Sequence, residues 1–329
     1  MSEVINTVKG ITLTPPVIGR ITLGHTEMRG TGDSAKARPV KDDHFHITTL
    51  VQNKTDRSWG VHPLAKVVSE GQEKLRAIPV VIAYNDPNLS LSNHYSAFDM
   101  KTGRVLCAGN GITARRATTE GVQSIACPRP EACEHGVRLR CKSMTRAYLQ
   151  IEGQTDELGV FALRTTSWNS LNHLATRLSQ LSGLTGGKTA GMPMLLQMES
   201  KTSTQSYREP FQFADLVVRP GMTLLQAIKV AADYQDAMAA AGLSLEGMED
   251  ALRAGLANGD FADEIEDIDE FLSDEDLIAA AGLGSHATGL RGLDSLNDKL
   301  RSVSVADATA PEESAAPENA NLSLLEEAA

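Results

Sequence analysis

The sequence predicts an α+β protein with a mainly antiparallel β core, two packed helices, and a loop between strands that four cysteines hold together. Short apolar or alternating runs, separated by turn residues, recur between residues 18 and 220 and are typical of strands. Two further stretches space their apolar residues as helices do. All four cysteines of the 329-residue chain fall between residues 107 and 141.

The first half of the chain is predicted to be strands. The stretch 18–29 alternates and is rich in β-branched residues, and the polar Gly/Pro stretch 30–41 is predicted to be a loop. HFHITTLVQ (44–52) is a second strand, and AIPVVIAYN (77–85) is a continuous apolar run that we expect to be buried. Residues 94–100 and 104–109 flank Lys101-Thr102-Gly103 and are predicted to form a hairpin.

The second half combines strands with two helices. Residues 143–152 and 158–166 are predicted to be a strand pair, as are 192–200 and 213–220. Ser167 can cap a helix that ends at the glycines 183, 186 and 187. Its apolar stripe is Leu171, Leu174, Leu178 and Leu181. Thr223 opens a second helix, to about Ala240, with a predicted core face of Leu224, Ile228, Ala231 and Ala232.

Charge separates the C-terminal part from the rest. Residues 1–230 carry a formal charge of +8 and residues 231–329 carry −19. We predict a β-rich core domain over 1–242, an acidic helical segment over 243–284, and a disordered acidic tail over 285–329. Four apolar residues recur at helical spacing among the acids and are the predicted partner-binding residues: Phe261, Ile265, Ile268 and Leu272.

Clustered cysteines can meet as two disulfides or as one metal site, with free thiols as the alternative. Residues 1–19 lack the basic flank and long apolar run of a signal peptide, so we expect a cytoplasmic, reducing location, where disulfides rarely persist. Four thiolates around one structural Zn²⁺ then fit best. The predicted ligands within the metal loop 104–142 are Cys107, Cys127, Cys133 and Cys141, and His135 could replace one of them.

Basic residues crowd the same loop and could form a face for phosphates. A solvated loop surface explains them nearly as well. The candidate nucleic-acid-binding residues are Arg115, Arg116, Arg129, Arg138, Arg140, Lys142 and Arg146. No apolar run approaches the length of a membrane span, so no membrane partner is expected.

The motifs VLCAGNG, ARR and CPRPEAC, the later cysteine, and the block LGVFALRTTSWNSLNHLATRLSQLSG together resemble the recombination directionality factor-like family of phages and other mobile elements. The resemblance covers roughly residues 5 to 220. Relatives with this pattern often carry only the label of hydrolase or metal-binding protein. The family's best-known role is to bind a phage serine integrase and switch it from integration to excision. The resemblance therefore implies a recombinase or another DNA-processing protein as partner.

Two other patterns suggest chemistry. Asp42, His44 and His46 share one face of a strand and could begin a metal site, with Asp86, His94 or Asp99 as further ligands. This gives the alternative of a metal-dependent hydrolase that uses His44 and His46. SGLTGGKT (182–189) resembles a phosphate-binding loop, but it follows a predicted helix and has Ser182 where glycine is needed, so a helix C-cap is the better interpretation.

We expect a non-enzymatic, zinc-binding accessory protein of DNA recombination or replication in a mobile element. It would act through a partner protein, DNA, or both. Besides the hydrolase, a second alternative is a single-stranded DNA-binding protein whose acidic tail masks its own basic face.

Overall fold

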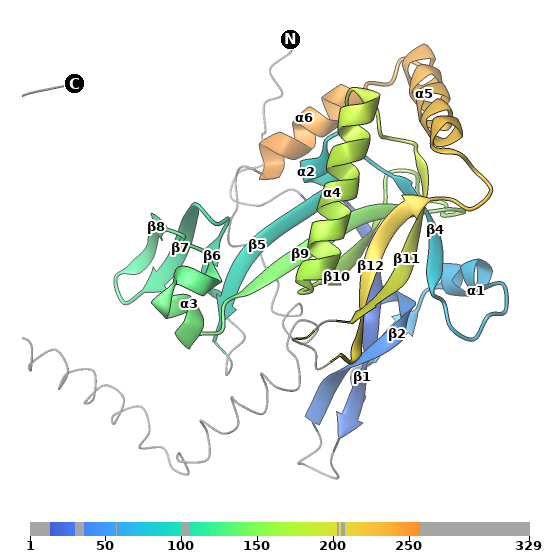
Figure 1. Ribbon diagram of the computed structural model, residues 1–329. Helices are drawn as coiled ribbons and strands as arrows, with labels where there is room; N and C mark the ends of the chain where they lie inside the picture. The colour runs from blue at the N-terminus through green and yellow to red at the C-terminus, as the bar shows by residue number, and fades with distance from the viewer. Residues whose placement is uncertain are drawn as a thin grey trace, which may run out of the picture. The chain divides into compact units, whose positions relative to one another are not determined.

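The computed structural model describes residues 14–29, 36–56, 58–99, 105–202, 204 and 208–256. Twelve strands form one sheet (Figure 1). They are β1 Val17–Arg29, β2 Lys36–Gln52, β3 Trp59–Val61, β4 Ala77–Ile82, β5 Leu91–Phe98, β6 Val105–Gly109, β7 Thr113–Thr118, β8 Gly121–Ala126, β9 Lys142–Ile151, β10 Val160–Thr165, β11 Pro193–Thr202 and β12 Pro210–Val218. Six α-helices accompany them in the described residues: α1 Pro63–Ser69, α2 Pro87–Ser90, α3 Glu134–Arg138, α4 Trp168–Thr185, α5 Leu224–Ala240 and α6 Leu245–Leu256.

The sheet is mainly antiparallel, as predicted. Its main path runs β3-β2-β1-β10-β9-β5-β6-β7-β8, and only β1 and β10 pair in parallel. Strand β9 changes partner along its length, because residues 142–147 pair with β5 whereas residues 149–151 pair with β4. The β4 branch continues into β11 and β12, while β5 leads away to β6, β7 and β8 (Figure 1).

The main core lies where α4 and α5 pack on the strands near the β4 branch. Leu174, Leu178 and Leu181 of α4 are buried there, as predicted, whereas Leu171 of the predicted stripe is half-buried. Ser167 accepts a backbone hydrogen bond as the N-cap of α4, and Gly186 ends the helix in the left-handed conformation. SGLTGGKT is therefore the end of a helix.

Two sequence predictions need correction. Residues 36–41 were predicted to be a loop, but they extend β2, whose pairing with β1 continues to Arg29 and Lys36. The pairing is made by backbone hydrogen bonds, so polar residues can take part in it. On α5, Ala231 is buried and Ile228 packs against the core, as predicted, but the other buried residue is Ala227, and Leu224 is 37% exposed. Alanine lets the helix backbone approach the sheet closely, so the contact is set by the small residues and the large leucine faces outward.

The hairpin predicted over 94–100 and 104–109 is confirmed as β5 and β6. The metal loop also contains regular structure that the sequence did not suggest, because strands β7 and β8 and helix α3 lie within 104–142. Short polar strands such as β7 and β8, which are largely exposed, give no apolar periodicity to detect.

Helix α6 packs against the core, although it lies beyond the boundary expected after residue 242. Met248 and Leu252 contact the cluster around Tyr84 and Tyr148. The predicted partner-binding residues Phe261, Ile265, Ile268 and Leu272 and the predicted tail lie outside the described residues. Within the described part, each helix is too short or too polar to cross a membrane.

Candidate functional site

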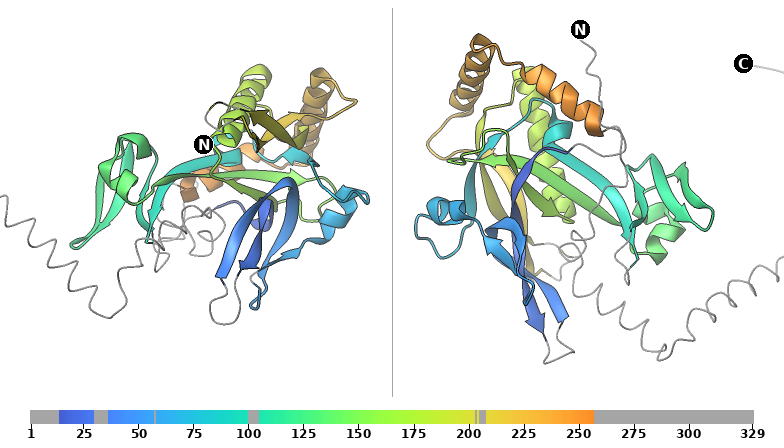
Figure 2. Two further views of the ribbon diagram at one scale, coloured as in Figure 1. Left: turned by 60° about the horizontal axis from the view of Figure 1, so that its bottom comes forward. Right: turned by 180° about the vertical axis from the view of Figure 1, so that it is seen from behind.

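Residues 105–141, here called the cysteine lobe, extend beyond the ends of β5 and β9. Figure 2 shows β6, β7, β8 and α3 grouped there in both views, apart from the helices of the main core. In the described residues, the lobe is joined to the sheet by the β5–β6 pairing, by packing of Ala97 on β5 and by the chain's entry into β9. Among the described strands, β8 pairs with β7 alone and is the outer edge. The lobe is thus a small unit presented at the end of a larger scaffold.

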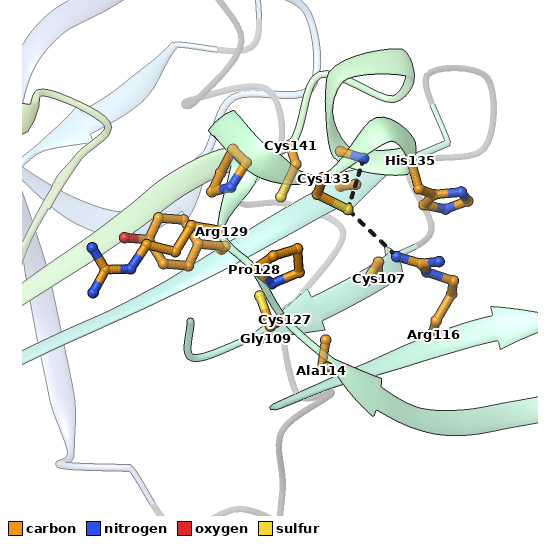
Figure 3. A pocket seen from close by; sticks show the side chains of 15 residues that line it. Cys107, Gly109, Ala114, Arg116, Cys127, Pro128, Arg129, Cys133, His135 and Cys141 are labelled. Atoms are coloured by element: carbon orange, nitrogen blue, oxygen red, sulfur yellow. Dashed lines mark hydrogen bonds between the residues drawn. The ribbon is translucent and has the colours of Figure 1, made fainter. Parts of the chain in front are cut away.

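The fold brings all four cysteines to one pocket (Figure 3). Cys107 lies on β6, Cys127 follows β8, Cys133 is the N-cap of α3, and Cys141 precedes β9. Backbone hydrogen bonds fix the connecting segments: the Cys127 N–H donates to Ile112 and the Cys141 N–H donates to Gly136. None of the four forms a disulfide.

Two hydrogen-bond donors point at one of the sulfurs. The backbone N–H of Gly136 donates to Cys133 Sγ over 3.3 Å, and the Arg116 guanidinium donates to the same sulfur over 3.6 Å. At Cys141, burial and the neighbouring sulfurs of Cys107, Cys127 and Cys133 raise the thiol pKa to about 12. Crowding of this kind is relieved when a cation neutralises the sulfurs.

Two glycines leave room around the sulfurs. A Cβ at Gly109 would lie 2.9 Å from Cys127 Sγ, and one at Gly136 would lie 3.3 Å from the Cβ of Cys141. A larger residue at either position would push a cysteine out of the pocket. The donor set of four sulfurs fits a zinc ion.

His135 also borders the pocket, but its imidazole is turned away from the four sulfurs (Figure 3). Its Nδ1 lies 3.2 Å from the Arg138 guanidinium. Its buried Nε2 has no hydrogen-bond partner among the described residues. Burial, aided by Arg116 and Arg138, lowers the pKa of His135. A role as ligand would require the ring to rotate.

The predicted basic residues spread over the lobe and its base. Arg115, Arg129, Arg138 and Arg140 are exposed, whereas Arg116, Lys142 and Arg146 are half-buried. Arg116 contacts Cys133, and Arg146 on β9 contacts His94. Arg129 extends away from the sulfurs (Figure 3). The lobe therefore presents its exposed arginines around the cysteine pocket.

A second group of potential metal ligands lies on the β1–β2 hairpin. The donor atoms of His25, Asp42 and His46 all lie within 4.8 Å of one another. The sequence suggested Asp42 and His46 but missed His25 on the neighbouring strand. It also suggested His44, which instead contacts Asp43. Among the more distant candidates, Asp86 pairs with Arg253 and His94 contacts Arg146.

The electrostatics of this group keep Asp42 ionised. Burial alone would raise its carboxyl pKa, but hydrogen bonds from His25 and His46 outweigh burial and leave the pKa lowered. Burial lowers the pKa of His46 despite the adjacent carboxylate. A neutral imidazole beside an ionised carboxylate is the state in which both groups can bind a metal ion.

A β-bulge positions the group. Thr22 pairs with His46 and Gly24 pairs with Lys41, so β2 contains three more residues than β1 in this interval. Gly24 makes this possible because a Cβ there would lie 2.1 Å from the carbonyl oxygen of Val40. The extra residues turn Asp42 toward both histidines.

Replacing Gly24 with alanine is expected to lower the free energy of unfolding by about 1–3 kcal/mol, because the new methyl group overpacks the hairpin. Urea denaturation measures this change. Gly183→Ala is the matched control, since its Cβ meets nothing within 4 Å and it lies within α4. The control should gain about 0.5–1 kcal/mol. Equal stability of Gly24→Ala and the wild type would show that the hairpin backbone yields freely.

The family model described as recombination directionality factor-like matches residues 18–219 of this chain. No curated protein and no solved structure matches it. The matched range extends from β1 through β12, so it contains both the cysteine lobe and the His25, Asp42 and His46 group.

Proposed function

We propose a function from the family to which the chain belongs, the recombination directionality factor-like family. The protein is a non-enzymatic accessory protein of site-specific recombination in a phage or other mobile element. It acts by contacting the recombinase of that element and the DNA to which the recombinase is bound. The contact surface is the cysteine lobe, and a structural zinc ion held by the four cysteines keeps that surface in shape.

The observation that carries this proposal is the backbone conformation of Arg129 within the lobe. Its φ of 70° and ψ of 164° lie in a region that is essentially restricted to glycine. Arg140, at the other end of α3, also has a positive φ of 55°. Holding a non-glycine residue there costs on the order of 1–3 kcal/mol. An arginine side chain at such a position is expected to serve recognition, because glycine would be the more stable choice.

The cysteines support the proposal by explaining how so small a lobe keeps its shape. Zinc bound by four sulfurs at about 2.3 Å would set them about 3.8 Å apart. In the described residues, no three of the cysteine sulfurs lie within 4.8 Å of one another. Zinc binding would therefore draw the sulfurs closer together. Cys107, Cys127, Cys133 and Cys141 would hold the ion as a closed structural site without an open position for catalysis.

The test is an Arg129→Gly variant, which removes the charge and relieves the backbone at the same time. Binding is measured in a salt series to the element's recombinase alone, to its DNA site alone, and to the recombinase–DNA complex. We expect binding to the complex to fall about five- to tenfold at low salt. If Arg129 contacts a phosphate, the slope of log K against log salt should decrease by about 1.

Arg208→Gly is the matched control, because Arg208 is exposed, has a φ of 65° and lies outside the lobe. Neither variant should be less stable than the wild type. Glycine adopts a positive φ without strain, which stabilises the folded state, and this gain offsets the greater conformational entropy that glycine gives to the unfolded chain. Equal binding losses in both variants would refute the lobe as the contact surface. Wild-type binding to single-stranded DNA alone, with no recombinase dependence, would support the alternative of a single-stranded DNA-binding protein instead.

A further inference from the structure

The His25, Asp42 and His46 group is not used by the proposed recombination function and lies outside the cysteine lobe. The hairpin brings one residue from β1 and two from β2 together around a single oxygen atom. His25 Nδ1 and His46 Nε2 each lie 2.7 Å from Asp42 Oδ2. Two imidazole nitrogens and a carboxylate oxygen are a common donor set for divalent transition metals in proteins.

The spacing of these atoms is close to that of a metal site. Two ligands about 2.1 Å from a tetrahedral ion lie about 3.4 Å apart. The observed nitrogen–oxygen separations of 2.7 Å must therefore widen by about 0.7 Å to admit an ion. That expansion would replace the two N–H···O hydrogen bonds with metal–ligand bonds to the same three atoms.

Exposure of the group leaves room for further ligands. The side chain of His25 is 48% exposed, that of His46 is 32% exposed and that of Asp42 is 15% exposed. An ion bound by three protein atoms on this surface keeps positions open to water, as in sites where three protein ligands leave a coordination position free. This arrangement differs from the closed sulfur site expected in the cysteine lobe.

Neighbouring groups determine which carboxylate is available. Asp43 is held by Lys74 and Arg76 and lies 3.1 Å from His44 Nδ1. Asp43 is therefore committed to ion pairs with these two cations. The His44 ring lies beside that of His46, with ring centroids 4.6 Å apart, but its Nδ1 is directed at Asp43. Asp42 is thus the carboxylate left for an ion, and His44 is not one of the ligands.

We propose that His25, Asp42 and His46 bind one divalent transition-metal ion in an exchangeable, partly hydrated site on the β1–β2 hairpin. The ligand class is Zn²⁺ or a similar borderline ion such as Co²⁺ or Ni²⁺, because imidazole nitrogen suits these metals and hard oxygen-seeking ions prefer carboxylates alone. The site is independent of any ion at the cysteines, since no residue is shared.

The experiment titrates Zn²⁺ into the reduced, metal-stripped full chain by isothermal titration calorimetry. The ligand variants are His25→Gln, Asp42→Asn and His46→Gln, and the matched control is His44→Gln on the same strand. Asp42→Asn retains the shape of the side chain, and His25 is half-exposed, so both variants are expected to fold. Thermal melting without metal verifies folding. Cys133→Ser, titrated in parallel, separates the hairpin site from the cysteines.

We expect one Zn²⁺-binding phase to weaken at least tenfold in each ligand variant, to persist in Cys133→Ser, and to change by less than about threefold in His44→Gln. The proposal is overturned if folded His25→Gln and Asp42→Asn bind Zn²⁺ as the wild type does. It is also overturned if His44→Gln loses as much affinity as they do, because the ligands would then be different ones. Neither result depends on the recombination assay.

Discussion

Replacing Cys133 with serine is expected to remove zinc from the cysteine lobe and to open the lobe, while the main sheet stays folded. The reason lies in how little apolar surface the lobe buries. Its hydrophobic cluster consists of three buried residues, Ala97, Cys107 and Ala114, with Ile125, Cys127, Leu139 and Cys141 packed around them. Three of these seven are cysteines. So small a core cannot hold strands on its own and needs a metal or another cross-link.

The main core contains no cysteine, so it should not respond to this change. Hydrogen exchange should therefore show lost protection in β7 and β8 and unchanged protection in β10 and β11. Elemental analysis should show a loss of about one zinc per chain. The zinc content is measured in proteins that also carry Asp42→Asn, so that an ion bound on the β1–β2 hairpin does not contribute to it.

Ser124→Ala is the control for the lobe, because Ser124 is an exposed residue of β8. It should keep both the zinc and the exchange protection. An unchanged zinc content in Cys133→Ser, or a reduced wild-type protein that holds no stoichiometric metal, would rule out the four-cysteine site.

Replacing Glu249 with alanine is expected to lower the free energy of unfolding by about 2–4 kcal/mol and to release α6 from the core. The carboxylate of Glu249 has 5% side-chain exposure and lies beside Arg253. It accepts hydrogen bonds from the backbone N–H groups of Asn85, over 2.5 Å, and Asp86. Alanine would leave these donors without their partner near the start of α2 and would remove one of the contacts that holds Arg253.

Burial raises the pKa of Glu249, although its backbone and arginine partners oppose the shift. A raised pKa in the folded state means that the native protein binds the proton more tightly than the unfolded chain does. The stability difference between the wild type and Glu249→Ala should therefore grow as the pH falls from neutral toward the ordinary carboxyl range.

Urea denaturation at two pH values measures both effects. Glu246→Ala is the matched control, since it removes the same charge from the exposed first turn of the same helix. It should change stability by no more than about 0.5 kcal/mol. Equal effects of the two substitutions would mean that α6 is not anchored through Glu249.

Local features could be predicted from the sequence because their causes are local. Ser167 and Thr223 cap α4 and α5 with their own side chains, and Gly186 ends α4 through its own backbone. The leucines of α4 fall on one face because helical geometry alone places residues three and four apart together. Four cysteines within 35 residues likewise indicated a common pocket, since so short a segment keeps them within reach of one another.

The tertiary structure decided what depends on register and on distant contacts. His25 joins Asp42 only because the β1–β2 pairing and its bulge place them side by side, and no residue spacing encodes that register. Glu249 contacts Asn85, which lies 164 residues earlier in the chain. The change in composition near residue 243 is a local feature, so it could not show that α6 packs on the core through this distant contact. The sequence placed Ala231 correctly on the buried face of α5, but close approach to the sheet buries Ala227 where the hydrophobic pattern indicated Leu224. The sequence by itself thus determined the helix caps, the α4 stripe and the cysteine cluster. Only the folded chain determined the hairpin ligand group, the anchoring of α6 and the arginine positions around the cysteine pocket, because each depends on pairing between segments far apart in the sequence.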